Sequence, residues 1–123
     1  MAGQLTIDTL KASSGVLATQ NGMTGICKAW AQFNGLTNTL INSFNVSSVT
    51  KNSTGNQTFN FTTAMPNATY AVSSGVGNTT ADAVQGGARV GSYSTTSVAL
   101  GVVNPAGTLF IDCANIALIV VGN

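Results

Sequence analysis

The chain has 123 residues, the length of a single domain, and only 6% of them are charged, against roughly a quarter in an average soluble domain. With a net charge of +1, this composition excludes a charged disordered tail, a coiled coil laced with charge pairs, and a nucleic-acid-binding protein with a basic face. Neutral polar residues replace the missing charges: 13 Asn, 17 Thr and 11 Ser.

Residues 1–25 differ in pattern from the rest of the chain. Residues 5–10 alternate briefly between apolar and polar side chains, and polar runs containing glycine interrupt this pattern further on. One short strand cannot stand alone, so this segment has to add to some sheet. It is either an arm that pairs with another subunit or a partner, or an edge strand of the same domain. The apolar residues that would make the contact are Leu5, Ile7, Leu10, Val16 and Leu17.

From residue 26 onward, period-two alternation and frequent turn signals predict short strands. The expected strands cover residues 26–33, 40–48, 57–63, 70–72, 88–93, 97–103, 109–111 and 116–121. The polar run Lys51–Asn56 predicts the turn of a hairpin. Seven or eight strands separated by such turns predict an all-β fold. We expect a jelly-roll-like antiparallel β-sandwich over residues 26–123, preceded by the N-terminal arm 1–25.

Aromatic residues supply most of the candidate core, because each buries on the order of 150–250 Å². The expected core residues are Trp30, Phe33, Phe44, Phe59, Phe61 and Tyr70.

The last expected strand is apolar on both faces and therefore has to be covered on both sides, either within the domain or by a neighbouring subunit. Ile116, Leu118 and Val120 are accordingly candidate interface residues, together with the arm. This is the first indication of an oligomer.

The residue inventory argues against an enzyme, a metal site and a cofactor. The chain has no His and no Glu, so no catalytic triad can form, and a glycosidase pair would have to come from Asp8, Asp82 and Asp112. Cys27 and Cys113 stand apart, which disfavours a zinc site. A bridge between them is conceivable if the first and last strands are neighbours, but we expect free thiols in a reducing cytosol.

We expect neither a signal peptide nor a membrane partner. Residues 1–10 already contain polar and acidic positions. The longest unbroken apolar run, Ile116–Val121, is far shorter than the ~20 residues of a spanning helix.

Several segments resemble a β-domain of virion proteins from tailed phages. They are Lys28-Ala29-Trp30, Phe33-Asn34-Gly35, residues 43–50 (Ser-Phe-Asn-Val-Ser-Ser-Val-Thr) and residues 60–70 (Asn-Phe-Thr-Thr-Ala-Met-Pro-Asn-Ala-Thr-Tyr). The family pattern runs Lys-Ala-Trp-x-x-Phe-x-Gly, Ser-Phe-Asn-Val-Ser-Ser and Asn-Phe-Thr-Thr-Ala-Met-Pro. The resemblance is close over residues 24–72 and general beyond them. The chain departs from the family at Ile41, where Arg is frequent, and at Lys51 and Asn56, where acidic residues are frequent.

The resemblance implies a non-catalytic structural protein of the virion, assembled in the host cytoplasm. A tail fibre needs a shaft, which 25 residues cannot build, so we expect a homotrimeric capsid decoration (cement) protein seated on the major capsid protein or another virion protein. The alternative is a receptor-binding tip of a tail fibre that contacts a host surface glycan. Its candidate recognition residues are Lys51, Asn52, Asn56, Asn78 and Thr79.

Overall fold

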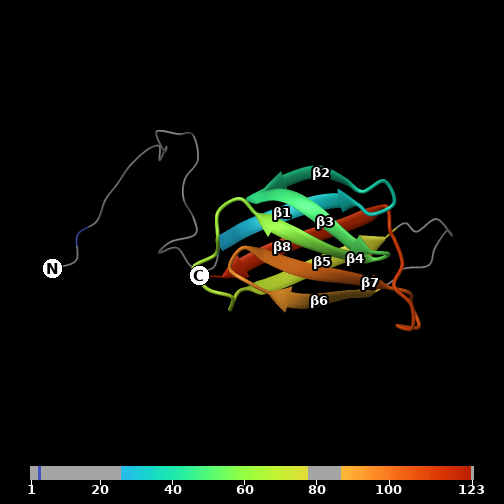
Figure 1. Ribbon diagram of the computed structural model, residues 1–123. Coiled ribbons are helices and arrows are strands. Elements are labelled where there is room, and N and C mark those ends of the chain that lie inside the picture. The colour runs from blue at the N-terminus through green and yellow to red at the C-terminus, as the bar shows by residue number, and fades with distance from the viewer. Residues whose placement is uncertain (1–2, 4–25, 78–86, 123) are drawn as a thin grey trace.

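The computed structural model describes residue 3, residues 26–77 and residues 87–122, and these ranges contain eight β-strands and no helix (Figure 1). The strands are β1 (Ile26–Asn34), β2 (Thr39–Phe44), β3 (Val46–Ser53), β4 (Asn56–Phe61), β5 (Ala71–Gly77), β6 (Gly87–Tyr93), β7 (Ser97–Val103) and β8 (Asn115–Gly122). The expected strand over 109–111 is wrong: Phe110 makes only an isolated bridge to Val103.

The strands form two four-stranded antiparallel sheets in the orders β2-β1-β8-β5 and β3-β4-β7-β6. The sheets face each other in two layers (Figure 1), and the buried residues of both form one apolar cluster between them. The all-β, two-sheet architecture expected from the alternation is therefore confirmed. In its centre, the rings of Phe33 on β1 and Phe59 on β4 meet edge to face, with centroids 6.0 Å apart.

The expected single strand over residues 40–48 is wrong, because the chain changes sheets at Asn45. This residue has a φ of 55°, in the left-handed region that Asn tolerates better than most residues. Its Nδ2 donates to Lys28 O at 3.0 Å, and its Oδ1 accepts a hydrogen bond from Thr63 N at 2.7 Å. Side-chain hydrogen bonds to β1 and to the segment after β4 thus hold the corner between β2 and β3.

Tyr70 closes one end of the sandwich. Its hydroxyl lies 2.9 Å from Ser94 O in the β6–β7 turn and 3.0 Å from Ser97 O at the start of β7, so its one proton is shared between these two carbonyls. Its ring packs edge to face on Phe61. Burial raises the pKa of the Tyr70 phenol above its ordinary value. The protonated phenol is therefore the form that the fold favours.

Gln57 is a polar residue on the inward face of β4, in line with Phe59 and Phe61. It is fully buried, and among the described residues neither its Oε1 nor its Nε2 has a hydrogen-bond partner. An unsatisfied buried amide costs about 1–3 kcal/mol, whereas an apolar side chain of similar shape carries no such penalty.

Gln57→Met is therefore expected to raise the free energy of unfolding by about 1–2 kcal/mol, measured by urea denaturation at neutral pH. Gln57→Glu is the matched control and should lower it, because a carboxylate is harder to bury than an amide. A loss of stability in Gln57→Met would mean that the amide is satisfied inside the fold.

Candidate functional site

The outer face of the β2-β1-β8-β5 sheet presents apolar side chains from neighbouring strands. Trp30 on β1 is the register partner of Phe44 on β2 and of Ile119 on β8, and Ile119 in turn faces Ser73 on β5. Ile119 is 49% exposed, and its neighbour on the same face of β8, Val121, is 38% exposed. We call this surface the outer face.

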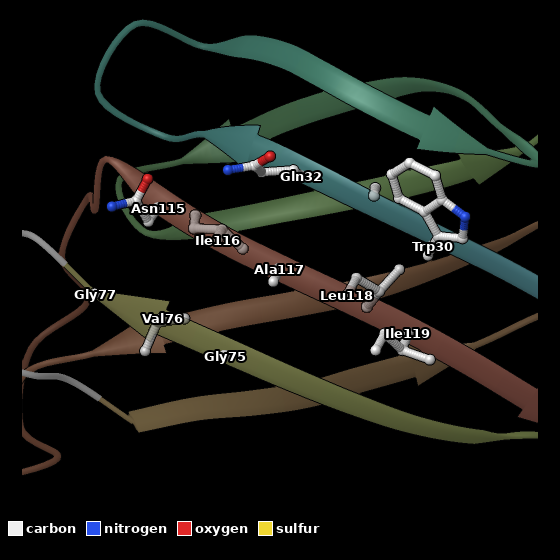
Figure 2. Close-up of a pocket in the computed structure, with 11 residues that line it drawn as sticks. Trp30, Gln32, Gly75, Val76, Gly77, Asn115, Ile116, Ala117, Leu118 and Ile119 are labelled. Carbon is white, nitrogen blue, oxygen red and sulfur yellow. The ribbon is translucent and has the colours of Figure 1, made fainter. Parts of the chain in front are cut away.

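The outer face is hollowed over β1, β8 and β5. The hollow has a volume of about 540 Å³. Trp30 and Ile119 lie at one end, Ala117 lies in the middle, and the amides of Gln32 and Asn115 lie toward the other end (Figure 2). No charged side chain lines it, so only apolar contacts and neutral hydrogen bonds are available to whatever occupies it.

Glycines on β5 keep this hollow open. Gly75 and Gly77 border it, and a Cβ added at either position would meet no atom within 4 Å. A bulky side chain from another molecule can therefore lie over β5 without displacing anything.

No protein-family model, curated protein or solved structure matches this chain. Its function therefore has to be argued from the chemistry of its surfaces.

The predicted interface residues of the last strand lie on the opposite side from the outer face. Ile116, Leu118 and Val120 are 0–1% exposed and belong to the core between the sheets. The prediction that they form an interface is wrong, because the register with β1 and β5 turns them inward and leaves Ala117, Ile119 and Val121 outside.

The predicted core residues divide into two groups. Phe33, Phe59, Phe61 and Tyr70 are buried. Trp30 is only half-buried and lines the outer hollow, which corrects its assignment to the core, and its partner Phe44 is also half-buried. Period-two alternation correctly predicts which face of β4 points into the core. It does not predict which face of β1 does so.

The predicted recognition loop at 51–56 is wrong in part. Lys51 and Asn52 belong to β3 and Asn56 to β4, so the turn itself is shorter than expected. Lys51 Nζ forms an ion pair with Asp112 Oδ2 at 2.7 Å and donates to Gly35 O at 3.0 Å. It therefore ties the hairpin to the segment before β8 and is already engaged within the chain.

Several other predicted residues fall outside the described ranges. These are Leu5, Ile7, Leu10, Val16 and Leu17 of the arm, Asn78 and Thr79 of the second recognition loop, and the carboxylates Asp8 and Asp82.

Both cysteines are free thiols. Cys27 is the register partner of Val121 near the end of β8, whereas Cys113 precedes the start of that strand, so they lie toward opposite ends of the sheet. Burial raises the pKa of the Cys113 thiol, and the neighbouring Asp112 charge adds to this, so Cys113 is poorly suited to act as a nucleophile.

The described residues offer neither a metal-ion cluster nor a helix that could span a membrane. In residue 3, 26–77 and 87–122, no three His, Cys, Asp or Glu side chains gather where they could hold a metal ion. Over the same stretch there is no helix of the length and apolarity that crossing a membrane requires.

Proposed function

We propose that the chain is a non-catalytic structural protein of a bacteriophage virion, and specifically a homotrimeric capsid decoration protein. The observation that carries the proposal is the hollowed outer face, which no charged side chain lines, with its half-buried Trp30 and exposed Ile119. An apolar surface of this kind marks a protein contact. We favour a second copy of the chain as the occupant of the outer face. The chain has only seven charged residues in 123, so few of its side chains could form ion pairs with a charged partner.

The resemblance over residues 24–72 supports the virion assignment. The segments that carry it lie in β1, at the β2–β3 corner and in β4 with the turn after it, so they belong to the scaffold. These segments support a virion β-domain, and they do not distinguish a position on the capsid from one on the tail. In this proposal the arm residues Leu5, Ile7 and Leu10 add a strand to a neighbouring subunit or to the capsid shell.

The finer features of the fold belong to the same proposal. A jelly-roll-like arrangement stays a prediction, supported by the central pairing of the first and last described strands, β1 and β8. The proposal of a trimer is likewise supported by the apolar outer face and by the fit of three-fold oligomers to the junctions of a capsid lattice.

The assembly prediction is tested by the oligomeric state of the purified chain. The wild-type chain should sediment as a trimer, and Ile119→Lys should sediment as a monomer, because a cation would have to be buried at the contact. The trimer should withstand 1 M salt, since there is little charge to screen.

Leu109→Lys is the matched control. Leu109 is 66% exposed in the segment between β7 and β8, away from the outer face, and the same change there should leave the trimer intact. An Ile119→Lys variant that still sediments as a trimer would exclude the outer face as the contact.

The virion assignment is tested separately by mapping the chain in intact particles. Icosahedral reconstruction should place it on the shell in near-stoichiometric ratio to the major capsid protein. Density at the tail alone would reject the decoration role and favour the alternative, a fibre tip that contacts a host glycan.

A further inference from the structure

A second hollow lies on the outer side of the other sheet, β3-β4-β7-β6. Asn56 on β4, Gly101 on β7 and Arg89 on β6 are register partners in one row across the sheet. Since Gly101 has no side chain, the ring of Phe110 lies close over it: a Cβ there would be 2.8 Å from Phe110 Cε1. The hollow measures about 360 Å³, within the roughly 300–1,000 Å³ of ligand pockets. We call it the Arg89 hollow.

Arg89 supplies the positive charge of this hollow. Its Nη2 donates to Gly107 O at 3.3 Å, which holds the side chain beside the turn after β7. Among the described residues, Lys51 and Asp112 form an ion pair, whereas Arg89 has no carboxylate partner there. A guanidinium carries five N–H donors in a planar fork that matches a carboxylate, so most of its donors remain for a ligand.

The groups around Arg89 are neutral and suited to a hydroxylated ring. On another part of this face of the sheet, a side-chain amide is hydrogen-bonded to a neighbouring side chain: Asn60 Nδ2 donates to Ser48 Oγ at 3.1 Å. In the hollow, by contrast, the side chains of Asn56 and Ser92 make no hydrogen bond to any described residue. The ring of Phe110 is 48% exposed and offers an apolar surface beside them.

We propose that the Arg89 hollow binds a saccharide that carries a carboxylate, such as a hexuronate. Arg89 would take the carboxylate through two parallel hydrogen bonds, Phe110 would pack against the C–H face of the sugar ring, and Asn56 and Ser92 would bond its hydroxyls. The small side chain of Ala99 and the absence of a side chain at Gly91 beside it leave room for the ring. A single cation beside an aromatic ring and neutral donors suits such a sugar better than an acidic peptide, which clustered cations would recognise.

The test is an NMR titration of the isotope-labelled full chain with three probes: trigalacturonate, the neutral galactose trisaccharide and acetate. Trigalacturonate should shift the backbone amides of residues 89–92, 101 and 110. It should bind at least about tenfold more tightly than either other probe, since only it combines the charge with the ring. No shift with trigalacturonate at millimolar concentration would overturn the proposal. Equal binding of acetate would also overturn it, because it would identify a general anion site.

Substitutions in the Arg89 hollow test which side chains contact the saccharide. Arg89→Gln and Phe110→Ala should each weaken trigalacturonate binding about tenfold, whereas Ser48→Ala, on the same sheet face but outside the hollow, should leave binding unchanged. Arg89→Gln binding as tightly as wild type would overturn the proposal, and so would shifts that map to the outer face. Because the two surfaces lie on different sheets, a failure here would leave the trimer prediction intact.

Discussion

Phe59→Ala is expected to lower the free energy of unfolding by about 3–5 kcal/mol, a large share of the 5–15 kcal/mol that holds a domain of this size together. Phe59 is fully buried, lies between Val49 and Val98 in the sheet, and meets Phe33 across the sandwich. Alanine would leave a cavity between two sheets whose backbones are fixed by hydrogen bonds. Urea denaturation followed by far-UV circular dichroism measures the loss.

Leu109→Ala is the control for this experiment. Leu109 is the most exposed large apolar side chain of the described residues, and its truncation should change stability by no more than about 0.5 kcal/mol. Similar losses in the two variants would show that the sandwich interior does not dominate the stability.

Gly55→Ala is expected to cost about 3 kcal/mol, from left-handed strain and overpacking together. Gly55 has a φ of +64°, and a Cβ there would lie 2.5 Å from Ile111 O and 2.7 Å from Val102 O. These are backbone atoms and cannot swing away. Gly55 N also donates to Asp112 Oδ1 at 2.7 Å, so any shift of the turn disturbs the carboxylate that pairs with Lys51.

Gly75→Ala provides the contrast. Gly75 has no positive φ, and a Cβ there would meet nothing within 4 Å, so this change should be neutral or slightly stabilising. Thermal unfolding of the two variants side by side measures the difference. Equal melting temperatures would mean that the turn at Gly55 adapts to a side chain.

Alternation of apolar and polar residues predicts the inward face of a strand when one face is apolar and the other is polar. Residues 56–61 place Phe59 and Phe61 inward, and residues 97–103 place Val98, Leu100 and Val102 inward, as period two requires. On β8 both faces are apolar, so the pattern cannot choose between them. Only the pairing with β1 and β5, which brings together residues far apart in sequence, decides that Ile119 faces outward.

The sequence pattern does not predict the corner at Asn45, for a related reason. Its hydrogen-bond partners, Lys28 O and Thr63 N, are 17 and 18 residues away, and no local signal reports them. Arg89 and Phe110 of the second hollow could not be grouped from the sequence either. The sheet register and the return of the chain across Gly101 bring them together.

The order β2-β1-β8-β5 also constrains how the protein is made. β8 lies in the middle of its sheet, with β1 on one side and β5 on the other, yet it is the last of the described strands to be synthesised (Figure 1). Until it leaves the ribosome, β1 and β5 have no common neighbour, and the backbone groups that they pair with β8 have no partner strand. The chain should therefore fold late and slowly, through contacts of long sequence separation. Until then, the nascent β1–β2 hairpin exposes an edge to every other copy being translated nearby.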